Sequence, residues 1–355
     1  MRAAVLEGPG RLKVRDVPTP SAGPGEVLVE VGANTVCGTD LRIMHGEKTT
    51  GVHTPVVLGH ETAGHVAEVG AGVVGYEVGA PVAMAPVIPC RWCPECRNDL
   101  ENACRNMRIM GYAIDGGMAE HMLVPADGIA AGNLFTAKRE LPSEQLALAE
   151  PLACVVNGHR WTGAVPDETV VVMGAGPIGL LHLQVSLLSG ARAVIVSEPS
   201  AARRAHAERL GATRTVDPGS DDLAAAVDDV SGGRGADVTV VAIGVPALVH
   251  EAVALTRVGG RVNLFAGFPK QAVAQVDPNL VHYRQVVLTG SSNARRRDYE
   301  TALRFIESGQ VETASMVTHR FGLGDVAEAI NTVAAGDALK VAVLPRTTSR
   351  KEDAP

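Results

Sequence analysis

The stretch TVVVMGAGPIG (residues 169–179) restricts the fold of this 355-residue chain more than any other segment. Residues 169–173 predict a buried strand, the glycines predict a tight turn, and the apolar residues after them predict a helix. Further strands are predicted further along the chain, with helical segments between most of them. They lie at residues 193–197, 237–242, 260–265 and 286–290. This alternation is typical of an α/β domain with a doubly wound parallel sheet covered on both faces.

The glycine pattern indicates a dinucleotide site, because G-x-G-x-x-G here follows a strand and opens a helix. A helix N-terminus at this turn would face the diphosphate. Glu198 lies about 20 residues further on, where a carboxylate binds the ribose hydroxyls, so NAD is favoured over NADP. Arg203 and Arg204 could instead hold a 2′-phosphate, and a glycine turn in an unrelated α/β protein is the alternative. The predicted cofactor-binding residues are Gly174, Gly176, Pro177, Ile178, Gly179, Glu198 and Arg203.

The chain on either side of this region has a different pattern of apolar residues. Short apolar runs split by Gly and Pro predict a mostly β, barrel-like domain before residue 150. The predicted strands lie at residues 27–31, 65–69, 81–85 and 120–124. The last sixty residues or so contain two helical patterns and a strand at 340–344, and the tail at 347–355 is expected to be frayed.

Four of the six cysteines lie within CRWCPECRNDLENAC, residues 90–104. A disulfide framework is not expected in a large intracellular chain, whereas cysteines two residues apart indicate a metal. Four thiolates complete a tetrahedral zinc shell and leave no position for a substrate, so this site is predicted to be structural. The alternatives are unliganded cysteines and a zinc ribbon that contacts nucleic acid. The predicted ligands are Cys90, Cys93, Cys96 and Cys104.

A second group of metal-binding residue types lies in VCGTD (36–40) and GHETAG (59–64). Cys37, His60 and Glu61 would offer a thiolate, an imidazole and a carboxylate, which with water make a plausible catalytic zinc site. The residues alone leave this open, because a histidine beside a glutamate is more often an ordinary surface or core pair.

These motifs, with AEPLACV (149–155), occur in the order of the zinc-dependent medium-chain alcohol dehydrogenases, and the chain resembles that family nearly end to end. It is most similar to the sorbitol (L-iditol) and threonine dehydrogenase branch. The resemblance implies a GroES-like β-barrel catalytic domain at residues 1–153 and 295–355, with the zinc lobe at 88–106. It also implies a Rossmann NAD-binding domain at residues 154–294.

The resemblance further implies one catalytic and one structural zinc ion per chain. Cys37 and His60 match catalytic zinc ligands, and Glu61 and Glu150 can share the remaining protein ligand position. Thr39 matches the hydroxyl that takes the alcohol proton. The catalytic set is therefore predicted to be Thr39, Cys37, His60, Glu61 and Glu150.

Two positions near this set carry open questions. Cys154 falls where the family places a side chain against the nicotinamide, although a buried small hydrophobe is an equal interpretation. Arg42 replaces a histidine that often ends the family's proton relay, and arginine has no acceptor, so the relay beyond Thr39 is in doubt. The run Arg295–Arg297 is either a phosphate site or, more often, a solvated helix start.

The expected activity is NAD-dependent oxidation of a secondary alcohol on a polyol or on a cyclitol or sugar-like molecule. L-Threonine 3-dehydrogenase and a sugar-phosphate dehydrogenase are the alternatives, and a nucleotide sensor is the non-enzymatic one. The net charge of −7 argues against nucleic acid and anionic membranes as partners. The N-terminus has no apolar signal segment, so a cytoplasmic protein is expected. The resemblance implies a homotetramer or homodimer.

Overall fold

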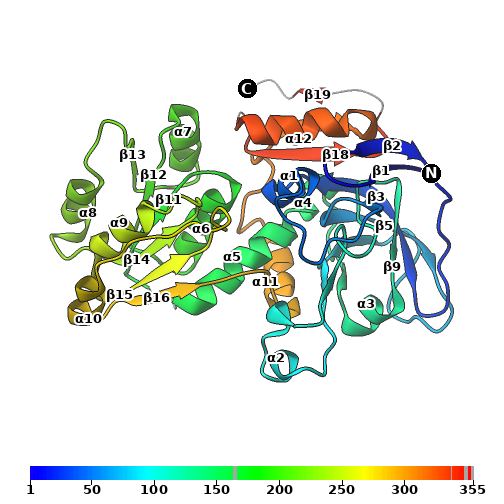
Figure 1. Cartoon of the computed structure of the whole chain (residues 1–355), viewed down its shortest axis with the longest axis horizontal. Helices are drawn as coiled ribbons and strands as arrows, with labels where there is room; N and C mark the ends of the chain where they lie inside the picture. The colour runs from blue at the N-terminus through cyan, green and yellow to red at the C-terminus, as the bar shows by residue number, and fades with distance from the viewer. Residues whose placement is uncertain (163–165, 337, 348–350, 353–355) are drawn as a thin grey trace. The chain divides into compact units, whose positions relative to one another are not determined.

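A computed structural model describes residues 1–162, 166–336, 338–347 and 351–352. The chain divides into two compact units (Figure 1). The first unit comprises Met1–Ala153 and Asn293–Pro355, and the second comprises Cys154–Ser292. The family resemblance predicts the second boundary after residue 294, two residues beyond the division after Ser292. The helix that crosses the first boundary, α5, spans Ala149–Thr162.

The second unit contains a six-stranded parallel sheet, counted over the residues that the structure describes. Its strand order is β13-β12-β11-β14-β15-β16. From β11 the chain first adds strands on one side and then, from β14, on the other, as in doubly wound folds. In chain order its elements are β11 (Thr169–Met173), α6 (Pro177–Leu188), β12 (Ala193–Ser197), α7 (Ala201–Arg209), β13 (Arg214–Val216), α8 (Leu223–Ser231), β14 (Ala236–Val241), α9 (Leu248–Leu255), β15 (Thr256–Leu264), α10 (Pro278–Arg284) and β16 (Val287–Gly290).

The composition of the central strands explains this sheet. Every residue of β11, β12 and β14 is buried, which requires cover on both faces. Helix starts follow from local capping: Ser200 and Asp222 accept hydrogen bonds from backbone amides of α7 and α8, and Pro177 occupies the first turn of α6. The expected strands are present within a few residues of their predicted ends, whereas β13 was not predicted.

The first unit is built on an eight-stranded sheet, a count that includes the short tail strand β19 (Lys351–Glu352) and applies to the described ranges only. Its N-terminal elements are β1 (Arg2–Leu6), β2 (Leu12–Asp16), β3 (Val27–Thr35), α1 (Gly38–Met44), β4 (Val56–Val57), β5 (Glu61–Val69), β6 (Pro81–Met84), β7 (Val87–Ile88), α2 (Pro94–Arg97), η1 (Glu101–Ala103), β8 (Arg108–Ile109), β9 (His121–Val124), α3 (Ala126–Ala131), β10 (Leu134–Thr136) and α4 (Ser143–Leu146). Its C-terminal elements are α11 (Arg296–Glu307), β17 (Val317–Gly322), η2 (Leu323–Asp325), α12 (Val326–Ala335), β18 (Lys340–Leu344) and β19.

Strand β3 joins the two ends of the chain within this unit. It pairs antiparallel with β5, β9 and β18, so the red C-terminal strand lies against the blue N-terminal one (Figure 1). A single core cluster contains residues from both ends, including Leu6, Leu58, Phe321 and Val341. The C-terminal segment is therefore part of the first unit.

The tail was expected to be frayed, and this is wrong for Lys351 and Glu352, whose backbone pairs with β17. Residues 348–350 and 353–355 lie outside the described residues. In the part of the chain that the structure describes, no helix is long and apolar enough to cross a membrane.

Candidate active site

Strand pairing brings Cys37, His60 and Glu61 together. Thr35, at the end of β3, pairs with Glu61 at the start of β5. Cys37 lies two residues beyond Thr35 at the N-cap of α1, and His60 directly precedes β5. As a result, one ligand atom from each of Cys37, His60 and Glu61 lies within 4.8 Å of the others.

Asp40 fixes the orientation of His60. One oxygen of this fully buried carboxylate lies 3.1 Å from Nδ1 of His60, and the other accepts a hydrogen bond of 2.9 Å from the Cys37 amide. With Nδ1 engaged, Nε2 is the ring nitrogen left for a metal, an arrangement typical of metal-binding histidines. Burial opposes a charged ring, but the nearby Tyr112 and Asp40 groups raise the pKa of His60 well above its usual value.

Glu61 is held by two side chains from other strands. The Thr35 hydroxyl donates a hydrogen bond to Oε2, and Nζ of Lys340 lies 2.6 Å from the same oxygen and 2.8 Å from Oε1. Lys340 begins β18 and is buried. Burial disfavours the ammonium, yet the charge of Glu61 keeps the pKa of Lys340 above its usual value. Glu61 therefore has a cationic partner inside the protein.

Thr39 and Glu150 lie around this cluster. Thr39 lies in the first turn of α1, two residues after Cys37, and is half-buried. Glu150 lies in the first turn of α5, and its charge acts on both Lys340 and Tyr112. Among the described residues, only Cys37, His60 and Glu61 form the close ligand cluster here, so Glu150 stands near the site but outside that cluster.

The four cysteines of residues 90–104 form a separate cluster, in which their Sγ atoms lie within 4.8 Å of one another. None of the six cysteines forms a disulfide. Backbone amides point at the sulfurs: the Cys93 amide lies 3.4 Å from Sγ of Cys90, and the Cys90 amide lies 3.3 Å from Sγ of Cys104. Burial opposes ionisation of Cys90, but the amides of Trp92 and Cys93 lower its pKa to about 6. The donor set fits a closed zinc site.

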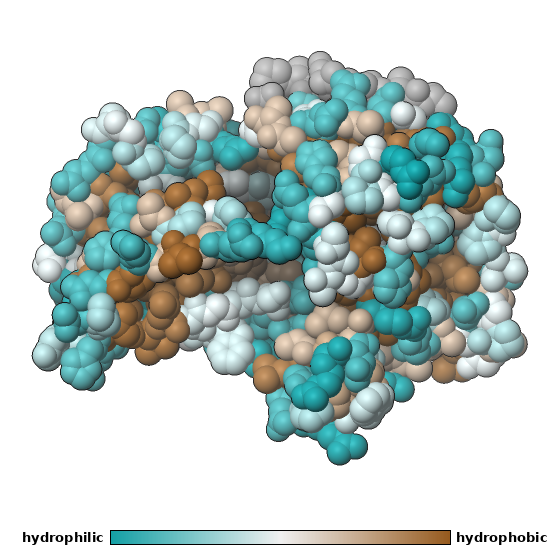
Figure 2. Space-filling view, in the orientation of Figure 1, coloured by the Kyte–Doolittle hydropathy of each residue, from teal (hydrophilic) through white to brown (hydrophobic). Residues whose placement is uncertain are grey.

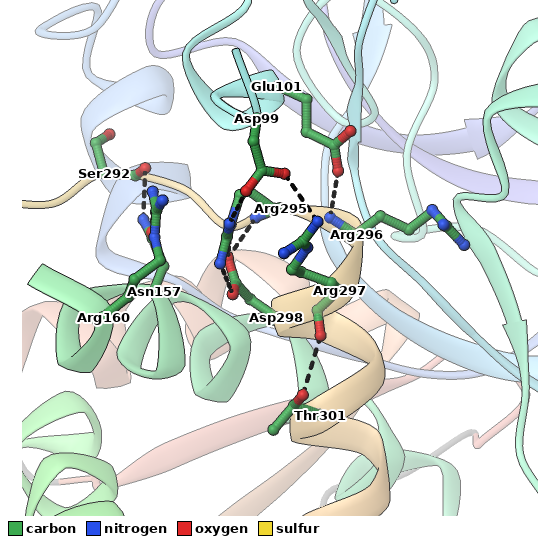
Figure 3. A network of polar contacts seen from close by, with 10 residues as sticks. All are labelled: Asp99, Glu101, Asn157, Arg160, Ser292, Arg295, Arg296, Arg297, Asp298 and Thr301. Atoms are coloured by element: carbon green, nitrogen blue, oxygen red, sulfur yellow. Dashed lines mark hydrogen bonds and ion pairs between the residues drawn. The ribbon is translucent and has the colours of Figure 1, made fainter. Parts of the chain in front are cut away.

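Carboxylates of this lobe bind the start of α11 (Figure 3). Asp99 contacts the guanidinium groups of both Arg295 and Arg297, the latter at 3.2 Å, and Glu101 accepts a 2.7 Å hydrogen bond from the Arg296 amide. Arg295 is buried and also pairs with Asp298 at 2.7 Å. The expectation of a solvated helix start or a phosphate site is therefore wrong for Arg295, whose charge is already neutralised within the protein.

In the second unit, the glycine turn follows β11 as expected. Gly174 has φ +101°, a conformation that favours glycine, and a Cβ at Gly179 would lie 1.8 Å from the Gly174 carbonyl oxygen. A Cβ at Gly176 would meet no protein atom within 4 Å, so this position faces space that a diphosphate could fill. Pro177 and Ile178 form the first turn of α6. The turn fits a dinucleotide.

Glu198 follows β12 and is buried beside this turn. Its two oxygens accept hydrogen bonds from the amides of Ala175 and Ser200, at 2.7 and 3.0 Å. This carboxylate therefore also holds the glycine turn in place, a role that sequence reasoning missed. Arg204 binds the carbonyls of Glu198 and Pro199 and pairs with Asp217 at 3.1 Å. Arg203 lies in the first turn of α7, and Cys154 is half-buried in α5.

Two family models match the chain. The alcohol dehydrogenase GroES-like domain matches residues 23–133, and the zinc-binding dehydrogenase model matches residues 177–308. The chain is 34% identical to L-threonine 3-dehydrogenase of Pyrococcus furiosus over 330 residues, covering 92% of this chain and 93% of the relative. The chain belongs to the zinc-dependent medium-chain alcohol dehydrogenase family.

Two further relatives show the breadth of this dehydrogenase family. L-Galactonate-5-dehydrogenase of Escherichia coli is 31% identical over 330 residues, covering 92% of this chain and 94% of the relative. A crystal structure of a putative zinc-binding dehydrogenase from Sinorhizobium meliloti, bound to NADP, is 35% identical with a TM-score of 0.91. It covers 97% of this chain and 99% of that chain. The protein is thus an NAD(P)-dependent zinc dehydrogenase.

Sequence reasoning missed three residues that hold the ligands of this dehydrogenase: Asp40, Thr35 and Lys340. Asp40 had a local signal, because a carboxylate three residues after Cys37 lies in the first turn of the helix that Cys37 begins. Lys340 had no such signal, since 279 residues separate it from Glu61.

Proposed function

We propose that this dehydrogenase oxidises a secondary alcohol of a polyol or sugar-like molecule to a ketone and transfers the hydride to NAD. The observation that supports this most is the cluster of Cys37, His60 and Glu61, whose ligand atoms lie within 4.8 Å of one another and whose histidine is fixed by Asp40. Three protein ligands leave a fourth position for a substrate oxygen, which is the arrangement of catalytic zinc sites.

Zinc bound at this cluster would polarise the alcohol oxygen and favour its deprotonation. The chain's own groups have separate tasks. Asp40 holds the His60 ring in place and directs Nε2 toward the cluster. Thr39 would relay the alcohol proton, with its hydroxyl oxygen accepting that proton while its own hydroxyl proton passes outward to solvent. Lys340 balances the charge of Glu61, which with Glu150 would share the remaining ligand position.

Glu198 supports NAD as the preferred cofactor. A buried carboxylate after the second strand binds ribose hydroxyls and repels a 2′-phosphate. Arg204, which could otherwise approach a 2′-phosphate, is already paired with Asp217 at 3.1 Å. The Sinorhizobium meliloti relative was crystallised with NADP, so both cofactors belong in the test.

The substrate has two candidate classes. The relatives are named for threonine and L-galactonate, and L-threonine 3-dehydrogenase is therefore the second candidate. The test is NAD- or NADP-linked absorbance with a panel of polyols, cyclitols, aldonates, sugar phosphates, simple secondary alcohols and threonine. We expect an NAD-linked signal on a polyhydroxylated compound. A signal on threonine alone would contradict the proposed substrate class. A signal with NADP alone would contradict the proposed cofactor.

We also propose that the dehydrogenase assembles as a homo-oligomer through β16. This strand forms an edge of its sheet and, among the described residues, pairs with β15 alone. Apolar surface gathers over β15 and β16 (Figure 2). Val258 of β15 and Val287 and Leu288 of β16 are exposed. An unpaired apolar edge strand favours pairing with a second copy. Light scattering on wild type and Leu288→Lys would test this.

A further inference from the structure

Two positive charges, Arg42 and Lys48, lie at the end of α1, the helix that Cys37 begins, and have no negative partner among the described residues. Lys48 follows α1, and its amide donates a 3.1 Å hydrogen bond to the carbonyl of Arg42, in the last turn of that helix. Neither side chain forms an ion pair with any residue that the structure describes. Burial and the charge of Arg42 together lower the pKa of Lys48. A half-buried cation beside a like charge is unfavourable unless something compensates it.

A chain of ring contacts connects Lys48 to the metal ligands. Its Nζ lies 5.4 Å from the centre of the Tyr112 ring, and this ring packs edge-on against His60 with centroids 5.3 Å apart. The ring attracts the ammonium only weakly and does nothing for Arg42. Within the described ranges, Nζ donates one hydrogen bond, to the Thr50 carbonyl, and this bond is long at 3.5 Å. The Lys48 ammonium therefore keeps donors for a ligand, and among the residues described only the Tyr112 ring connects it to His60.

Arg42 lies on the same side of α1 as Thr39, because the two are three residues apart on the helix. The acidic residues nearby cannot neutralise the pair. Asp40 is buried on the other side of the helix and already engaged by His60 and the Cys37 amide, and Glu47 is exposed and has no ion pair within the described chain. The positive charge therefore lies at the end of the helix that carries Thr39, the residue proposed to accept the alcohol proton.

We propose that Lys48, assisted by Arg42, binds an anionic group of the substrate, so that the dehydrogenase acts on alcohols that carry a carboxylate or a phosphate. This inference rests on the function proposed above and narrows its substrate class. Both groups offer the charged oxygen acceptors that an ammonium and a guanidinium bind. A neutral polyol would leave the two cations uncompensated when it displaces water from the site.

The test compares compounds that share one carbon skeleton and differ in their terminal group: D-gluconate, D-glucitol and D-glucitol 6-phosphate. The corresponding galacto compounds and L-threonine extend the series. kcat/KM is measured on the zinc-loaded full-length protein at saturating NAD. We expect at least one anionic compound to exceed its neutral counterpart about tenfold or more, since a charge-assisted hydrogen bond contributes about 10- to 100-fold. The anionic compound with the higher kcat/KM shows whether the site prefers a carboxylate or a phosphate.

Lys48→Met should lower the ratio of anionic to neutral kcat/KM by about 10- to 100-fold, mostly through KM. Lys48→Arg should restore most of that ratio, because it keeps the charge. Lys13→Met, at an exposed lysine of β2, removes a charge of the same kind and should leave the ratio unchanged. A wild-type preference for the neutral compounds would overturn the inference. So would a Lys48→Met variant that raises only the KM for NAD, since the cations would then serve the cofactor diphosphate.

Calorimetric binding of the same compounds to the zinc- and NADH-loaded protein separates this inference from the proposed function. If no alcohol is oxidised but an anionic compound binds and Lys48→Met weakens it about tenfold or more, the proposed function fails and the anion site stands. If neutral polyols are oxidised and bind as well as their anionic counterparts, the anion site fails and the proposed function stands.

Discussion

The first unit contains two metal-binding clusters that are constructed in opposite ways. The four cysteines come from fifteen consecutive residues, and backbone amides of the same loop orient their sulfurs. Cys37, His60 and Glu61 come from the ends of two paired strands, and side chains from β3, α1 and β18 hold them. A closed site can be specified locally. A site with an open position needs partners from distant parts of the chain to keep its ligands in place without filling that position.

The largest effect should follow from a change at the open cluster. Cys37→Ser removes a ligand of the metal that polarises the alcohol, which contributes several kcal/mol to the reaction. We expect kcat/KM to fall by about 1,000-fold or more. Thermal unfolding should shift by only a few degrees, because the cysteine lobe remains intact. NADH absorbance measures the first result and thermal denaturation the second, and retained turnover would remove this cluster from the catalytic role.

A Cys→Ser substitution in the cysteine lobe should have the opposite effects, a large loss of stability and little loss of the catalytic metal. Cys104→Ser opens a closed shell whose metal binding contributes on the order of 10 kcal/mol to the folding of such lobes. We expect Tm to fall by about 10 °C or more. Protein that remains folded should keep the metal at Cys37 and His60. A variant with unchanged Tm and lost activity would mean that the two clusters have been assigned the wrong way round.

A smaller effect should come from the group that orients His60. Asp40→Asn keeps the shape of the side chain but removes its charge, and we expect metal affinity at the open cluster to fall about 10- to 100-fold. Competition with a chelator measures this affinity. Asp99→Asn, in the cysteine lobe, is the matched control, because that carboxylate binds Arg295 and Arg297 and no cysteine. Equal losses of catalytic metal in both variants would contradict the contrast between the clusters.

The range of the contacts determined what could be predicted from the sequence. The glycine turn, the strand before it and the four-cysteine spacing are local patterns, and the structure has each of them in the expected place. The gathering of Cys37, His60 and Glu61 came from the family resemblance, because their residue types alone left an ordinary pair as an alternative. The order of the motifs along the chain supplied the family resemblance, which predicted a metal site that no single local motif could predict.

Ion pairs between residues far apart in the chain could not be predicted from the sequence. The arginines at 295–297 suggested solvent or phosphate, because nothing near them indicates that Asp99, 196 residues earlier in the chain, binds Arg295. Lys340 was likewise read only as the start of a strand. Each pairing depends on which strands or loops become neighbours, and charge patterns carry no such information across another folded unit.

Lys340 also bears on the order in which the protein can mature during synthesis. A ribosome delivers Glu61 well before Lys340, and the whole second unit, a continuous segment able to fold by itself, emerges between them. Until β18 inserts beside β3, the buried Glu61 carboxylate lacks its ammonium partner, and the central strand of the eight-stranded sheet lacks one neighbour. The catalytic cluster can therefore become complete only after the second unit has been synthesised.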